Sequence, residues 1–393
     1  MTLKQRSITL LVLAEIAGMS LWFVSSAVLG DMSKEVNLGT NFKAALTSSV
    51  SAGFVIGALL SAIIGLPDRV DPRWIFGISA IFAAISNACL VVLAADSEWA
   101  IALRFAIGFC LAGVYPVGMK IAVGWGTNDR GLLVGLLVGG LTMGAAFPHL
   151  LAYIGGADWR VTTLMATAFA LLAALLISQT KLGPHHAQAS RFQPEAIKLS
   201  WQNKSIRLAF AGYLAHVWEL YGMWAWISVA LSAAFSLNMV NSDAEMTAKI
   251  VSFVAIASGA FSCPIAGVLA DRYGKARITI VAMAISGAAA LTAAFFFTGN
   301  PWLLSAIVIV WGASVIADSA QFSALIADYA PADKAGSLMT FQTAIGFALT
   351  LVIVQITPHL AQMFGWPIMF CILGIGPLIG IVAMWPLRRS HMG

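Results

Sequence analysis

Two carboxylic acids stand at matching places in two similar stretches of the sequence. Glu15 opens E-I-A-G-M-S-L-W, which ends at Trp22, and Glu219 opens E-L-Y-G-M-W-A-W, which ends at Trp226, 204 residues later. Seven residues make nearly two turns of a helix, so the acid and the tryptophan of each stretch share one face. An acid inside an apolar helix costs free energy and is by default a functional residue.

The chemistry that such acids can perform is proton transfer, because removal of a carboxyl group from water favours its neutral form. We therefore expect Glu15 and Glu219 to face each other across a central cavity, where they bind and release protons. Glu219 is the expected carrier of the coupled proton, because His216 and several aromatic residues surround it. The alternative is that each acid only joins helices by hydrogen bonds.

A second polar group lies further along the chain. Trp311, Ser314, Asp318 and Gln321 recur at i, i+3, i+7 and i+10, which places them on one helical face. Such a face must look into the protein or into a water-filled cavity. The predicted cavity residues are Glu15, Trp22, Arg104, Tyr115, His216, Glu219, Tyr221, Trp226, Trp311, Ser314, Asp318 and Gln321.

The composition indicates what must position these residues. Of 393 residues, 60% are hydrophobic and only 10% are charged, against about 25% charged in soluble domains. The apolar residues form runs of about 20, the length of a membrane-spanning helix. The net charge of +5 comes from basic residues in short loops, so we expect no nucleic-acid partner. The four cysteines have no paired spacing, and we expect neither a metal site nor a cofactor.

The apolar runs predict an all-α polytopic membrane protein with twelve transmembrane helices in two pseudo-symmetric six-helix bundles. The predicted spans are 8–30, 44–66, 74–95, 99–123, 131–154, 161–179, 208–235, 250–270, 278–298, 302–326, 336–357 and 366–387. We expect an N-terminal bundle at 1–179, a linker at 180–207 and a C-terminal bundle at 208–393. Asp129-Arg130 and Asp333-Lys334 repeat after the fourth and tenth spans. Parallel repeats of this kind are typical of transporters.

The basic residues predict the orientation. Sixteen Lys and Arg residues fall in the loops on one side of the predicted spans and four on the other. By the positive-inside rule both termini and the linker are cytoplasmic. We expect a monomer in a bacterial inner (plasma) membrane.

One loop suggests a family. The stretch from Gly267 to Arg277 reads G-V-L-A-D-R-Y-G-K-A-R, which resembles the signature G-x-x-x-D-R-x-G-[RK] of the major facilitator superfamily. The first-half copy keeps an aspartate and two arginines but has Asp71 in place of the second glycine. The resemblance implies two bundles that rock around a central cavity, with these loops as a conformational latch. The latch residues would be Asp68, Arg69, Arg73, Gly267, Asp271, Arg272, Gly274 and Lys275. The alternative is that their charges only end helices and fix the topology.

Arg104 and Gly108 resemble the R-x-x-x-G pattern in the fourth helix of proton-driven branches of that superfamily. The alternative is an arginine that extends to the membrane interface.

The predicted function is proton-coupled secondary transport of a small organic solute by alternating access, with export favoured, and not an enzyme activity. One alternative is a divalent-metal transporter that uses Glu15, His216, Glu219 and Asp318 as ligands. A second alternative is an importer of small organic or inorganic anions, which would need basic residues deep in the cavity.

Overall fold

The computed structural model describes residues 1–126, 129–185, 193–331 and 333–389, and the regular structure in these ranges is helical. The first half of the chain, the N-half, forms α1 (Leu3–Met19), α2 (Val24–Glu35), α3 (Thr40–Ile64), α4 (Leu66–Arg69), α5 (Pro72–Leu90), α6 (Trp99–Leu111), α7 (Tyr115–Val123), α8 (Arg130–Gly155) and α9 (Trp159–Ser178).

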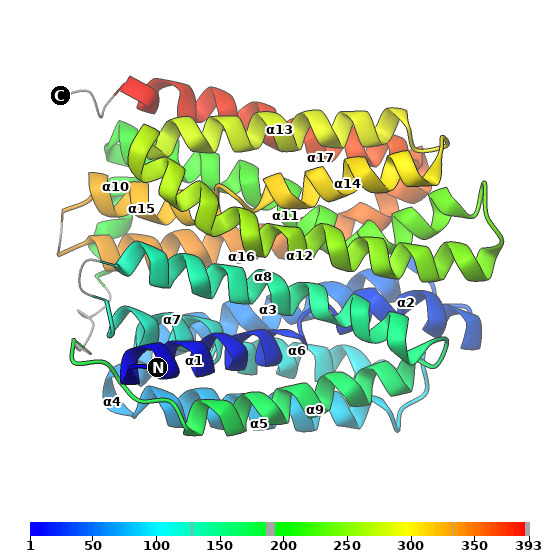
Figure 1. Ribbon diagram of the computed structural model, residues 1–393, viewed down its shortest axis with the longest axis horizontal. Helices are drawn as coiled ribbons and strands as arrows, with labels where there is room; N and C mark the ends of the chain where they lie inside the picture. Colours follow the sequence, from blue (N-terminus) through cyan, green and yellow to red (C-terminus); the bar gives the residue numbers. More distant parts are fainter. Residues whose placement is uncertain (127–128, 186–192, 332, 390–393) are drawn as a thin grey trace.

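The second half, the C-half, forms α11 (Lys204–Phe235), α12 (Asn241–Tyr273), α13 (Lys275–Phe295), α14 (Pro301–Val315), α15 (Ser319–Tyr329), α16 (Ala335–Phe364) and α17 (Trp366–Met384). Two short 3-10 segments and one short helix accompany them: η1 (Pro194–Lys198), α10 (Leu199–Gln202) and η2 (Trp385–Arg389). The helices of the two halves run side by side as two layers (Figure 1).

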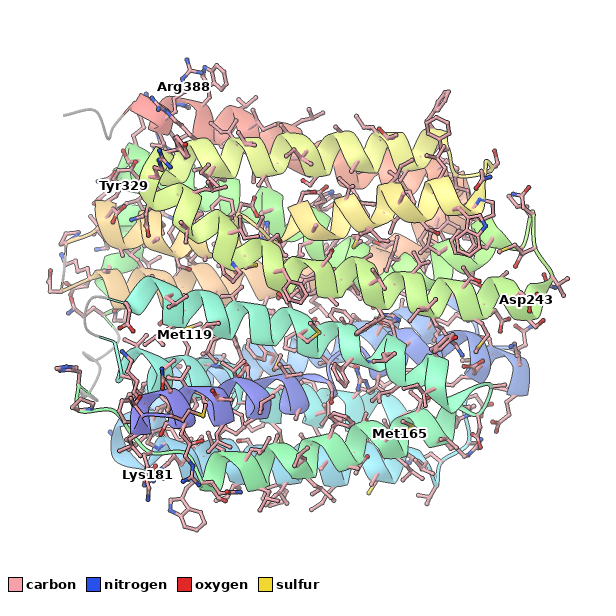
Figure 2. The ribbon with its side chains drawn as sticks, in the orientation of Figure 1. Met119, Met165, Lys181, Asp243, Tyr329 and Arg388 are labelled. Atoms are coloured by element: carbon pink, nitrogen blue, oxygen red, sulfur yellow. The ribbon has the colours of Figure 1, made fainter. Side chains whose placement is uncertain are left out.

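Both termini lie at one end of the bundle, which we call the terminal end, and the opposite end is the distal end (Figure 1). Lys181, Tyr329 and Arg388 lie at the terminal end and Asp243 at the distal end (Figure 2). The halves meet where α8 packs on α12 and where α3 packs on α16. Close approach at the first contact depends on Gly139, since a Cβ there would lie 3.0 Å from the Ala260 carbonyl oxygen. The glycines of α8 thus serve helix packing.

Eleven helical segments of the described chain are long and apolar enough to cross a membrane. The predicted seventh span is not among them, although α11 runs for 32 residues. Its tryptophans, tyrosines, His216 and Glu219 make it less apolar than the other spans. Since α11 packs against α12, α16 and α17, it takes the seventh place in the bundle.

Three predicted spans are each broken into two helices, which the sequence analysis did not foresee. The first is broken between Met19 and Val24, the fourth between Leu111 and Tyr115, and the tenth between Val315 and Ser319. Pro116, in the first turn of α7, accounts for the second break because it has no N–H to donate to the preceding turn. Discontinuous helices often form the binding site in membrane bundles built from repeats, so these three breaks are candidates for a site.

The predicted linker is only partly irregular. Residues 186–192 lie outside the described ranges, and η1, α10 and the first turn of α11 occupy its second part. The backbone N–H of Gln193 donates to Ser337 Oγ over 2.8 Å, which ties this part to α16. The division into 1–179, 180–207 and 208–393 stays a prediction.

Candidate functional site: buried acids at the broken helices

Glu15 lies inside the N-half, and its carboxyl group makes no hydrogen bond to the described residues. Its exposed fraction is 0%, and neither carboxyl oxygen has a hydrogen-bond partner among the described residues. A Cβ on Gly118 would lie 2.6 Å from Glu15 Oε2, and one on Gly140 would lie 3.5 Å from its Cγ. The carboxyl group therefore sits in a slot between α1, α7 and α8 that two glycines leave open.

Glu219 lies at the matching place in α11, and both of its oxygens are used. Ser286 Oγ donates to Oε2 over 2.9 Å and Trp311 Nε1 donates to Oε1 over 2.8 Å. These donors come from α13 and α14 of the same half. The two glutamates thus do not face each other as expected, because each carboxyl group lies among helices of its own half.

His216 pairs with Asp318 and not with Glu219, the partner that the sequence suggested. His216 Nδ1 lies 2.8 Å from Asp318 Oδ1, and both side chains are only 2% exposed. Asp318 stands at the break before α15. The His216 ring lies against Phe322, with ring centroids 5.4 Å apart, and is stacked with Tyr213. An acid and an imidazole held together in this way can exchange a proton.

The predicted polar stripe faces α11 on both sides of the break. Trp311 reaches Glu219 and Asp318 reaches His216, while Gln321 is buried one turn further on. Ser314 differs, because its hydroxyl donates to the Val310 carbonyl oxygen of its own helix over 2.7 Å.

Tyr115 connects the Glu15 slot with the other half. It is the first residue of α7, and its side chain lies near that of Glu15 and, across the interface, near those of Tyr213 and Cys263. Tyr221, on α11, lies near both Tyr115 and Tyr213. The three tyrosines therefore gather polar groups near the Glu15 slot and α11.

Aromatic rings close the interface beside these tyrosines. The Trp22 ring lies 5.4 Å from that of Phe347 and 6.4 Å from that of Tyr221, both of the C-half. Phe54 lies 4.4 Å from Phe347, again across the halves. Trp226, the sequence counterpart of Trp22, instead donates to the Val354 carbonyl oxygen of its own half over 3.0 Å.

Arg104 holds the break in the first span. Its two terminal nitrogens donate to the carbonyl oxygens of Leu21 and Trp22 over 2.9 and 2.5 Å. Backbone carbonyls at the end of a helix inside a membrane need donors, and a buried guanidinium group supplies two. Arg104 is therefore a positioning residue for Trp22, and neither of the two interpretations from the sequence included this contact.

Comparison with known proteins decides the family. The model of the Major Facilitator Superfamily matches residues 10–354 and 220–392. The chain belongs to this superfamily. It is a membrane transporter and not an enzyme, and the fold predicted from the sequence is confirmed.

Among curated relatives, the chain is 26% identical over 249 residues to an uncharacterized 38 kDa protein in the 23S RNA operon of Thermoproteus tenax, with 61% of each chain covered. It is 23% identical over 280 residues to the inner membrane transport protein YnfM of Escherichia coli (strain K12), covering 68% of this chain and 64% of the relative. The match thus spans less than two thirds of these relatives' length.

Solved structures share the fold at low sequence identity. A point mutant of the nucleoside transporter NupG superposes with a TM-score of 0.75 at 16% identity, covering 98% of this chain and 100% of that chain. A D-xylose-proton symporter also gives a TM-score of 0.75, at 13% identity and 98% coverage of each chain.

Ion pairs join the two halves of this superfamily member at the distal end. Lys249 of α12 binds Asp31 of α2 over 2.6 Å, and the same ammonium group donates to the carbonyl oxygens of Ala152 and Gly156 at the end of α8. Lys34 pairs with Glu245 across the same interface. These contacts were missed because their partners are more than 90 residues apart.

Further hydrogen bonds join the two halves beside these ion pairs, and a hollow lies next to them. The pairs join Thr40 to Gln362, Ser48 to Gln355 and Asn41 to His359. The hollow has a volume of about 440 Å³ and is lined from both halves, with Asp31, Lys249 and Trp226 in its wall.

The signature loop of the first half makes contacts within the N-half. The Asp68 side chain lies outside the described residues, and Arg69 is exposed. Arg73 binds Asp71 over 2.5 Å and the Thr180 carbonyl oxygen over 3.2 Å. Lys120 donates to the Pro67 carbonyl oxygen over 2.8 Å.

The loop of the second half likewise makes contacts within its own half. Asp271 is exposed, and the Arg272 guanidinium group lies 5.3 Å from the Tyr273 ring. Lys275 binds Asp328 over 2.5 Å. Gly274 has a φ of +95°, which favours glycine, while Gly267 has open space around its Cα. The latch role of both loops stays a prediction.

Proposed function

We propose that this superfamily member is a proton-coupled secondary transporter of a small organic solute. The observation that carries the proposal is the Glu15 carboxyl group, which is fully buried and without a partner among the described residues. An ionised carboxylate in such a place would cost several kcal/mol. Glu15 is therefore neutral in this state, which means that it holds a proton.

Proton release then requires a change of conformation. Glu15 becomes stable as an anion only when water or a donor reaches its slot, and Tyr115 lies near both Glu15 and Tyr213 of the other half. A rocking motion that separates the halves would admit water along this path. We propose that this motion couples proton release to alternating access.

The distal ties belong to the same cycle. Opening of the distal end requires the separation of Lys249 from Asp31, a pair in which both charges are buried. Each ion pair described above at the terminal end lies within one half. We propose that the distal ties hold one of the two alternating states, and that the loops with Asp68 and Asp271 act at the terminal end.

The two alternatives are less well supported. The metal hypothesis needs its four ligands together, but Glu219 is occupied by Ser286 and Trp311 and Glu15 lies in the other half. In the described part of the chain, no three His, Cys, Asp or Glu side chains form a metal-binding group. The anion hypothesis needs an available deep cation, whereas Arg104 donates to two backbone carbonyls.

We further propose that the terminal end is cytoplasmic, as the basic loops indicate. The protein would act as a monomer in an inner membrane, without a cofactor. The solute is a small molecule whose class the transport assay must identify.

The test uses purified full-length protein in liposomes that enclose a pH-sensitive dye. Organic cations, weak acids, amino acids, nucleosides and divalent metals are added one class at a time, with and without a pH gradient. We expect protons to move across the membrane when one class of organic solute is added, and not when that class is absent. Solute movement that is independent of pH, or movement of divalent metals alone, would contradict the proposal.

A further inference from the structure

A cleft lies at the terminal end of the C-half, apart from the buried acids. It has a volume of about 540 Å³, within the range of about 300–1,000 Å³ that is usual for ligand sites. Four basic and two acidic side chains line it, which gives it a net charge of +2. We call this the basic cleft; its charged residues are Asp271, Arg272, Lys275, Arg277, Asp328 and Arg388.

An exposed apolar stripe on α12 ends at this cleft. Phe261, Ile265 and Val268 are each more than 60% exposed, and Arg272 continues their helical spacing of i, i+4, i+7 and i+11. In a membrane this face lies against lipid chains. The stripe therefore leads from the apolar core of the bilayer to a cationic group of the cleft.

A second stripe reaches the cleft from the last helix. Leu378, Val382 and Trp385 are each more than half exposed and follow the same spacing. The Arg388 guanidinium group lies 3.4 Å from the Trp385 ring centroid, so the stripe again ends in a cation of the cleft. A tryptophan in this position is typical of the membrane–water interface. Arg388 lies at the terminal end (Figure 2).

We propose that the basic cleft binds the headgroup of an anionic phospholipid whose chains lie along the two stripes. The phosphate would pair with Arg272 and Arg388, the cations at the ends of the stripes. The start of α13 contributes as well, because Gly274 caps it without a side-chain hydrogen bond and Lys275 and Ala276 line the cleft. A basic pocket at the cytoplasmic ends of membrane helices is typical of anionic lipid recognition.

A soluble phosphate shares this headgroup chemistry, but it would gain nothing from the apolar stripes. A basic cleft could also serve only to fix the topology of the chain. The experiment distinguishes these three cases.

The full-length protein is purified in a neutral detergent, and its melting temperature is measured with added phosphatidylglycerol, phosphatidylcholine, glycerol phosphate or inorganic phosphate. The variant Arg272→Gln/Arg388→Gln removes two charges from the cleft. Lys198→Gln/Lys204→Gln is the matched control, since both lysines are exposed at the same end but lie outside the cleft. Arg388→Gln alone serves if the double variant does not fold, because Arg388 lies in a short terminal turn.

We expect phosphatidylglycerol to raise the melting temperature of the wild type and of the control by several degrees. The melting temperature of the cleft variant should rise by at most half as much. Native mass spectrometry should show the same ranking of retained lipid. An equal shift in the cleft variant and the control, or an equal effect of phosphatidylcholine, overturns the proposal. An equal effect of glycerol phosphate or inorganic phosphate also overturns it, in favour of a soluble anion.

Discussion

Glu15 and Glu219 occupy the same position in two related halves, but their surroundings differ. Glu219 accepts hydrogen bonds from Ser286 and Trp311, so both of its oxygens are satisfied. Glu15 is equally buried and has neither bond, and its neighbours are the backbones of Gly118 and Gly140. A sequence motif repeated in both halves has therefore acquired two different environments.

The difference suggests a division of roles. Two donors join a buried carboxyl group to its neighbours and stabilise its ionised form, which opposes the effect of burial on its protonation. A buried carboxyl group without donors is stable only when it is neutral, and it must change its charge when water arrives. We therefore propose that Glu15 carries the coupled proton and that Glu219 has a structural role, which reverses the preference that the sequence gave.

The largest effect is expected from filling the Glu15 slot. Gly118→Ala would place a Cβ 2.6 Å from Glu15 Oε2, the end of a flexible side chain, so the carboxyl group itself must shift within its slot; displacement of a reacting group by about 1 Å can lower a rate by about 100-fold. We expect a loss of this size in pH-driven solute transport. Gly131→Ala is the control, because it has open space around it. Equal transport by the two variants would show that the slot is not part of the coupling path.

A smaller effect, on stability and not on coupling, is expected from Trp311→Phe. The change removes the Nε1 donor and leaves one Glu219 oxygen buried without a partner, which costs about 1–3 kcal/mol. The measurement is unfolding of the purified protein in detergent, with Trp302→Phe, an exposed residue of the same helix, as the control. If Trp311→Phe were as stable as the wild type but its solute transport no longer depended on pH, the coupled proton would belong to Glu219.

The smallest effect is expected from Ser286→Ala. One hydrogen bond to Glu219 is lost, but Trp311 remains, so the free energy of unfolding should fall by about 0.5–1.5 kcal/mol. Ser236→Ala is the control, because that exposed hydroxyl bonds only within its own helix. A larger fall in stability than that of Trp311→Phe would contradict this order of effects.

The sequence predicted the membrane bundle and which spans enclose its acids, because apolar runs and enclosed charges are local signals. The partners of those acids are set by tertiary packing, which local patterns do not contain: Ser286 and Trp311 lie 67 and 92 residues after Glu219. The break between Met19 and Val24, which Arg104 stabilises, contains no proline, so the sequence carried no signal for it. The break before Tyr115 did have one, in Pro116, and a closer reading of the sequence could have found it.

The central claim is tested most directly by two transport assays on the variants Glu15→Gln and Glu219→Gln in liposomes. Counterflow exchanges labelled solute without net proton movement, whereas transport driven by a pH gradient requires it. The account predicts that Glu15→Gln retains counterflow and loses pH-driven transport, while Glu219→Gln retains both and unfolds at a lower temperature. Loss of pH-driven transport in Glu219→Gln, with wild-type behaviour in Glu15→Gln, would contradict it.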